Sequence, residues 1–133
     1  MKLLNEETKQ FEEFNSHILA IDYDGTIDYA GFPKVGNADM NTIKALKEWK
    51  TAGNKLILWT CRDGSSLIDA VRYMNDLGID FDAVNENIPE IKKLGFRSPK
   101  IFAHHYIDDA ANAGFSSKEK VSAMIQFFLE MNR

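Results

Sequence analysis

The sequence predicts an α/β fold in which a doubly wound, mostly parallel β-sheet is flanked by helices. Short, continuously apolar runs alternate along the chain with segments whose apolar residues have helical spacing. Polar residues cluster directly after the apolar runs. This second pattern is typical of such sheets, because their ligands bind beyond the carboxyl ends of the strands.

The strands are expected at residues 18–21, 56–59, 81–84 and 106–107. The first two runs contain only apolar residues, and the last two are shorter or less apolar. Runs without polar alternation favour strands that are covered on both faces, as in a parallel sheet.

Segments with helical spacing connect these runs. Residues 40–49 and 67–74 each carry apolar side chains on one face, and Gly53 and Gly78 follow them at positions where a helix commonly ends. We therefore expect a helix in each of these two connections.

Both ends of the chain are also predicted to be helical. In the C-terminal segment, an apolar stripe over 121–128 follows Ser116 and Glu119, which have the spacing of a capping box. Residues 1–14 are predicted to form a helix with a thin apolar face.

Length and composition indicate a single domain over residues 1–133. The chain has 133 residues, of which 44% are hydrophobic, and its one cysteine excludes an intrachain disulfide. Glutamates stand where a signal peptide would be apolar, and no apolar run is long enough to span a membrane, so we expect a cytoplasmic protein without a membrane partner. The net charge of -4 argues against general nucleic-acid binding.

Carboxylates gather after the first and the last predicted strand. Asp22 and Asp24 follow the first strand, with Gly25 permitting a tight turn, and Asp108 and Asp109 follow the last. If these strands are neighbours, the crowded carboxylates must be neutralised by a proton or a cation. Oxygen ligands of this kind suit Mg²⁺, which takes one or two carboxylates and leaves its other positions to water and phosphate.

The order of these motifs resembles that of the haloacid dehalogenase superfamily. Asp22-Tyr23-Asp24-Gly25-Thr26, then Thr60, then Lys100, then Asp108-Asp109 are similar to the four motifs of that family. The resemblance covers about residues 18–112 and implies a Mg²⁺-dependent phosphatase with a Rossmann-like core. The gaps between the motifs are too short for a cap domain, so the chain looks like a small capless bacterial member.

The resemblance implies a role for each motif residue. Asp22 is the nucleophile that forms an aspartyl-phosphate, and Asp24 is the general acid and base. Thr60 and Lys100 bind the phosphate. The implied metal ligands are Asp22, Asp24 through its backbone carbonyl, and the pair Asp108 and Asp109, of which one is a direct ligand and the other orients it.

Other residues near the motifs have structural or open interpretations. Arg62 either binds the phosphate or a distal anionic group of the substrate, or it is an exposed loop arginine. Cys61 is expected to be a small buried side chain. His104 and His105 are adjacent on a strand and point to opposite faces, so we expect hydrogen-bonded structural roles for them.

Two other functions use related chemistry. A phosphoacceptor signalling module also has an acceptor aspartate and Mg²⁺, but its acidic pair lies on the first strand and its acceptor two strands later. A phosphotransferase would pass the phosphoryl group to a sugar, and the missing cap counts against it because water is not excluded.

A capless site leaves the size of the phosphorylated substrate open. The substrate is either a large molecule, such as a phosphorylated polymer, or a small one enclosed by a neighbouring subunit of a homo-oligomer. Tyr29, Phe32 and residues 85–87 are placed where they could contact a leaving group.

Overall fold

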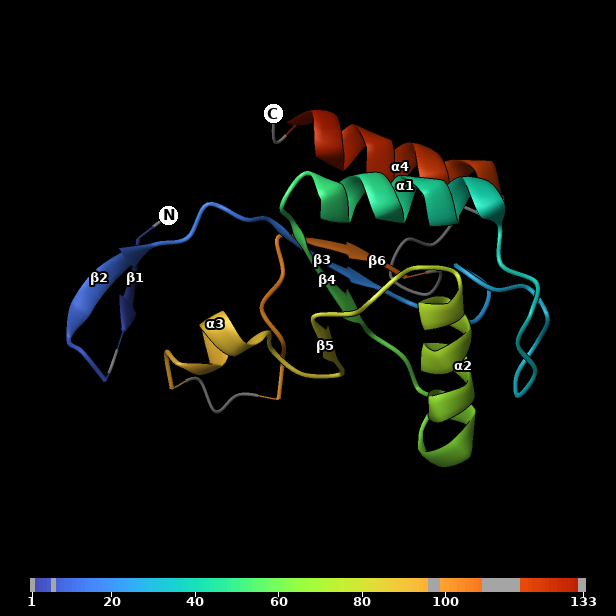
Figure 1. Cartoon of the computed structure of the whole chain (residues 1–133), viewed down its shortest axis with the longest axis horizontal. Helices are drawn as coiled ribbons and strands as arrows, with labels where there is room; N and C mark the ends of the chain where they lie inside the picture. Colours follow the sequence, from blue (N-terminus) through green and yellow to red (C-terminus); the bar gives the residue numbers. More distant parts are fainter. Residues whose placement is uncertain (1, 6, 96–98, 109–117, 132–133) are drawn as a thin grey trace.

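In the computed structural model, which describes residues 2–5, 7–95, 99–108 and 118–131, a parallel sheet of four strands forms the centre of the protein (Figure 1). Its strands are β3 (Ile18–Ile21), β4 (Lys55–Leu58), β5 (Ala83–Val84) and β6 (His105–Ile107), in the order β5-β4-β3-β6. The predicted strands and the α/β class with helices flanking a parallel sheet are therefore confirmed.

The helices α1 (Met40–Thr51), α2 (Gly64–Asp76) and α4 (Lys118–Met131) pack on one face of the sheet. Leu19 and Ile21 of β3 point to this face and join a buried cluster with apolar side chains from all of these helices. Figure 1 shows α1 and α4 side by side over the sheet, and α1 contacts α4 extensively. The long helices thus share one hydrophobic core with alternate residues of the strands.

The predicted helix ends are confirmed. Gly53 and Gly78 each lie two residues beyond the last residue of α1 and α2, and both have a φ of 89°. This left-handed conformation favours glycine and stops the helix. The stripe predicted for the C-terminal helix is buried at Val121 and Ile125, whereas the capping residue Ser116 lies outside the described residues.

Shorter segments cover the opposite face of the sheet. Ile18 and Ile57 point to this side and form a second buried cluster with Ile91 of α3 (Pro89–Lys92). Leu3 and Phe14, from the N-terminal segment, pack against the same cluster. The sheet therefore separates two apolar clusters that both depend on its alternating side chains.

The N-terminal segment is a β-hairpin, so the helix predicted for residues 1–14 is wrong. β1 (Lys2–Asn5) and β2 (Gln10–Glu13) pair antiparallel, and Lys9 has a φ of 58° in the turn between them. A helix here would have had only a thin apolar face to bury. The hairpin and the residue that follows it instead place Leu3 and Phe14 against the second cluster, and this tertiary contact outweighs the helix propensity of the glutamates.

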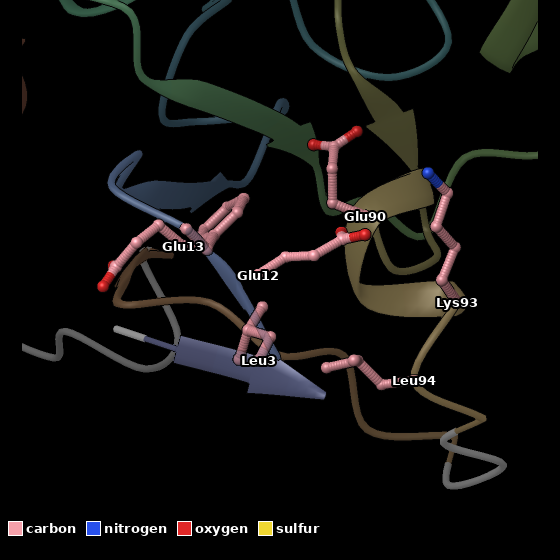
Figure 2. A pocket seen from close by; sticks show the side chains of 7 residues that line it. Leu3, Glu12, Glu13, Glu90, Lys93 and Leu94 are labelled. Atoms are coloured by element: carbon pink, nitrogen blue, oxygen red, sulfur yellow. The ribbon is translucent and has the colours of Figure 1, made fainter. Parts of the chain in front are cut away.

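A cavity of about 70 Å³ lies between the hairpin and α3 (Figure 2). It is lined by both apolar and charged side chains, namely Leu3, Glu12, Glu13, Phe14, Glu90, Lys93 and Leu94. This cavity marks the junction of the hairpin with the rest of the domain. Over the described part of the chain, no helix has both the length and the apolar character needed to cross a membrane.

Candidate active site

The central strand β3 brings Asp22 to the carboxyl edge of the sheet. Ile21 pairs with Leu58 of β4 and with Ile107 of β6, so the residues that follow these strands emerge side by side. The ladder continues past the strands: the Asp22 N–H donates to the Ile107 carbonyl at 2.8 Å, and the Trp59 N–H donates to the Ile21 carbonyl at 2.9 Å.

An open cavity of about 340 Å³ lies at this edge. It is lined by Asp22, Trp59, Thr60, Cys61, Asn85 and Asp108. The structure thus brings together the nucleophile, one phosphate-binding residue and one metal ligand expected from the sequence, although they are far apart along the chain. Asp109 lies outside the described residues.

A tight turn after β3 holds the Asp22 carboxylate. The Tyr23 carbonyl accepts hydrogen bonds from the N–H groups of residues 26–28, and Gly25 has a φ of 78°. This turn lets the Thr26 hydroxyl donate to Oδ2 of Asp22 at 3.1 Å. The glycine and the threonine of the first motif therefore have a structural explanation, which is to orient the first aspartate.

Asp28 organises the loop that follows the turn. Its buried carboxylate accepts a hydrogen bond of 2.6 Å from the Tyr23 hydroxyl and further bonds from the N–H groups of Ala30, Gly36 and Asn37. Burial by itself would raise the pKa of Asp28, but these hydrogen bonds together hold its pKa below the ordinary value. Asp28 is thus a charged anchor for the loop beside the site.

Arg62 is buried and forms a bidentate ion pair with Asp24. Its Nε donates to Oδ2 at 2.8 Å and its Nη2 donates to Oδ1 at 2.7 Å. The remaining N–H groups donate to the carbonyls of Pro33, Lys34 and Ser66. All five guanidinium N–H groups are used, so none is left to donate to a phosphate in this arrangement. The alternative expectation of an exposed loop arginine is wrong, because Arg62 is buried.

Thr60 and Lys100, the other expected phosphate-binding residues, differ in their positions. Thr60 lines the cavity, and its Oγ1 accepts a hydrogen bond from the backbone N–H of Arg62 at 3.1 Å. Because the hydroxyl oxygen accepts this bond, its hydrogen remains to donate to another oxygen. Lys100 is exposed and is not among the residues that line the cavity.

The neighbouring cysteine and the histidines can also be placed. Cys61 is exposed at the cavity, so the expectation of a buried side chain is wrong. His104 accepts the Ile18 N–H through Nδ1 at 2.9 Å. The His105 ring stacks on Phe128 of α4 with a centroid distance of 4.1 Å. The hydrogen-bonded structural role expected of His104 is confirmed, whereas the contact shown for the His105 ring is aromatic stacking.

The fold and the site permit comparison with known proteins. No protein-family model and no curated protein matches this chain. The solved structure of a conserved protein from Bacteroides thetaiotaomicron is similar, with 31% sequence identity, a TM-score of 0.71, and coverage of 85% of this chain and 92% of that chain. This chain belongs to the same family as that Bacteroides protein. The description of the Bacteroides protein names no activity, so the relationship supports the shared α/β fold and leaves the chemistry to the site.

The carboxylate oxygens that line the cavity of this protein are suitable ligands for Mg²⁺. Asp22 and Asp108 both line the cavity, and two carboxylates with water and a substrate phosphate are an ordinary ligand set for this ion. The Asp24 carboxylate is paired with Arg62, so the group of Asp24 that could ligate the metal is its backbone carbonyl oxygen. Across the described ranges, no group of three or more His, Cys, Asp or Glu side chains is arranged to hold a metal.

Two cavity residues, Trp59 and Asn85, have positions that the motifs do not assign. Trp59 directly follows β4, and Asn85 directly follows β5 and has a φ of 55°. In the sequence, Trp59 is the last residue of the apolar run 56–59, and Asn85 follows the run 81–84, at the end where ligands of a parallel sheet bind. The side-chain partners of Asn85 depend on contacts between segments and could not be inferred from that signal.

Proposed function

We propose that this protein is a Mg²⁺-dependent phosphatase of the haloacid dehalogenase type, which hydrolyses a phosphomonoester through an aspartyl-phosphate on Asp22. The observation that carries the proposal is the shared cavity, in which Asp22, Asp108 and Thr60 meet beyond the carboxyl ends of β3, β6 and β4. The order of the motifs along the chain supports the same function. In this proposal the sheet is a capless, doubly wound Rossmann-like core.

Asp22 supplies the nucleophile. One of its carboxylate oxygens bonds to phosphorus as the bond to the leaving alkoxide breaks, and water then attacks phosphorus and releases Asp22. The hydrogen bond from Thr26 to Oδ2 limits rotation of this carboxylate. A nucleophile held in one orientation lowers the barrier because less freedom is lost on reaching the transition state.

Asp24 moves the protons in both half-reactions. It donates a proton to the leaving alkoxide and later accepts one from the attacking water. Its bidentate ion pair with Arg62 fixes the orientation of the Asp24 carboxylate in the turn that follows Asp22. Arg62 therefore has a positioning role in the proposal rather than the phosphate-binding role expected from the sequence.

The remaining motif residues neutralise the phosphate. The Thr60 hydroxyl donates to a phosphoryl oxygen, and Lys100 offsets charge between the phosphate and Asp22. Asp22 and Asp108, with Asp109 and the Asp24 carbonyl, would hold Mg²⁺. When bound, this ion would neutralise charge on the phosphoryl oxygens.

The proposal is tested by release of p-nitrophenol from p-nitrophenyl phosphate, with Mg²⁺ and with excess chelator. We expect metal-dependent turnover. Replacing the nucleophile in Asp22→Asn should lower kcat by at least about a thousandfold, since the covalent step is lost. Asp24→Asn should slow turnover by about 10²- to 10⁴-fold, the usual contribution of general acid–base catalysis.

The control variant is Asp69→Asn, which changes an exposed carboxylate on α2 that does not line the cavity. Its activity should equal that of the wild type. Wild-type-level turnover in Asp22→Asn would remove the nucleophile from the proposal. A folded protein that gains one phosphoryl mass but releases it slowly would instead support the phosphoacceptor module, and transfer to an added sugar would support the phosphotransferase.

A further inference from the structure

The side chain of Asn85 forms a two-point contact with the backbone of Thr60. Its Oδ1 accepts the Thr60 N–H at 2.8 Å, and its Nδ2 donates to the Thr60 carbonyl at 2.8 Å. The Asn85 N–H in turn donates to the Leu58 carbonyl at 2.8 Å, which ties it to the end of β4. The peptide groups on both sides of the Thr60 Cα are therefore held by one side-chain amide.

This contact requires an amide at a left-handed position. A carboxylate could accept the Thr60 N–H but could not donate to the Thr60 carbonyl, and a hydroxyl is too short to do both. Asn85 has a φ of 55°, a conformation that is unfavourable for most residues and that asparagine and glycine adopt most readily. Among the common residues, asparagine alone meets both demands.

Thr60 itself is held at two levels. The Asn85 side-chain amide fixes the Thr60 backbone, and the backbone N–H of Arg62 donates to the Thr60 Oγ1 at 3.1 Å. The Thr60 hydroxyl accepts this bond, so its hydrogen can donate to another oxygen. Thr60 and Asn85 both line the cavity that contains Asp22. The position of the hydroxyl relative to Asp22 thus depends on a contact between the segments after β4 and β5.

We propose that Asn85 is a positioning residue for the reaction, which acts through Thr60 by holding its hydroxyl at the distance from Asp22 that a phosphoryl oxygen requires. The inference rests on the proposed phosphatase function. The two-point contact of the Asn85 side chain with the Thr60 backbone is called the clamp below. Loss of the clamp lets the segment after β4 move, and small displacements of a group that contacts the transferring phosphoryl group lower kcat strongly.

The test compares Asn85→Gly, Thr60→Val and the double variant. Glycine tolerates the left-handed backbone, so Asn85→Gly removes the clamp without adding strain. With Mg²⁺ and p-nitrophenyl phosphate, we expect Asn85→Gly to lower kcat/KM by about tenfold. In the Thr60→Val background the same change should cost less than about twofold, because the group that Asn85 positions is already absent.

A matched control is Lys9→Gly, which also replaces a residue at a left-handed position, with a φ of 58°, but in the distant hairpin turn. It should leave kcat/KM unchanged. Exchange of the Thr60 amide hydrogen, followed by NMR, should speed up in Asn85→Gly and not in Lys9→Gly. This readout reports on the clamp without depending on activity.

Each outcome has a distinct meaning. Full activity in Asn85→Gly, with an active wild type, would overturn the inference and leave the proposed function standing. Losses that multiply in the double variant would also overturn it, because Asn85 would then contribute independently of Thr60. A wild type without metal-dependent turnover would refute the proposed function and the inference with it, even if Thr60 amide exchange showed that the clamp exists.

Discussion

Arg62 is the residue around which the polar groups beside the cavity are arranged. Its side chain is 1% exposed, and the guanidinium lies over the Tyr23 ring at 4.8 Å from the ring centroid. The hydrogen bond that it donates to Asp24 raises the pKa of Arg62, against the lowering effect of burial. A buried guanidinium is tolerated only when its charge and its N–H groups are paired, and here they are.

At the scale of single residues, we predict that Arg62→Lys destabilises the protein although the positive charge is kept. Lysine cannot reproduce the planar fork that pairs with Asp24 and reaches the carbonyls of Pro33, Lys34 and Ser66. The free energy of unfolding, measured in urea, should fall by about 2–3 kcal/mol. The control Arg72→Lys, at an exposed position on α2, should change it by less than about 0.5 kcal/mol, and an equal loss in both variants would contradict the pairing argument.

At the scale of secondary-structure elements, His104 joins β6 to the start of β3. The ring Nδ1 of His104 accepts the backbone N–H of Ile18 at 2.9 Å. The backbone N–H of His104 donates to the Ile18 carbonyl, also at 2.9 Å. Burial and then the nearby His17 and His105 lower the pKa of His104. A protonated Nδ1 could no longer accept the Ile18 N–H, so the neutral ring is the form that stabilises this junction.

We therefore predict that acidification weakens the fold through His104. Its folded-state pKa lies below the ordinary value of 6.5, so the unfolded chain takes up the proton first as the pH falls. The neutral His104 ring contributes its full stabilisation above pH 6.5. This stabilisation is lost as the pH falls from 6.5 through the folded-state pKa of His104. The free energy of unfolding should thus decrease as the pH falls below about 6.5.

His104→Asn is the matched variant, because the Asn carbonyl oxygen can accept the Ile18 N–H and does not titrate. Its unfolding free energy should depend less steeply on pH over the same range. Identical slopes for the wild type and His104→Asn would show that other groups cause the pH dependence. His105, whose pKa is also lowered by burial and by His17, is the first such group to examine.

At the scale of the whole molecule, the sheet connects two apolar clusters. Ile125 of α4 lies in the cluster under the long helices, and Ile91 of α3 lies in the cluster on the opposite face. Both are almost fully buried. Because alternate residues of the same strands enter both clusters, neither face can lose its packing without disturbing the sheet that supports the other.

We predict that Ile91→Ala and Ile125→Ala each lower the free energy of unfolding by about 2–5 kcal/mol and that their effects add in the double variant. Unfolding in urea should remain a single transition. Phe127→Ala, which truncates a side chain that is 62% exposed on α4, serves as the control and should have little effect. Two separate transitions would show that the two sides of the sheet unfold independently and would contradict the single domain expected over residues 1–133.

The sequence by itself determined the order of the strands and of the three long helices after residue 17, the glycines that end α1 and α2, and the edge of the sheet at which Asp22 and Asp108 lie. These features follow from local periodicity and from chain order, because parallel strands present their carboxyl ends together. Only the tertiary structure decided the N-terminal hairpin, the pairing of Arg62 with Asp24, and the Asn85 contact with Thr60. Each of these is a contact whose free energy exists only after distant segments have packed, and no pattern within one segment records it.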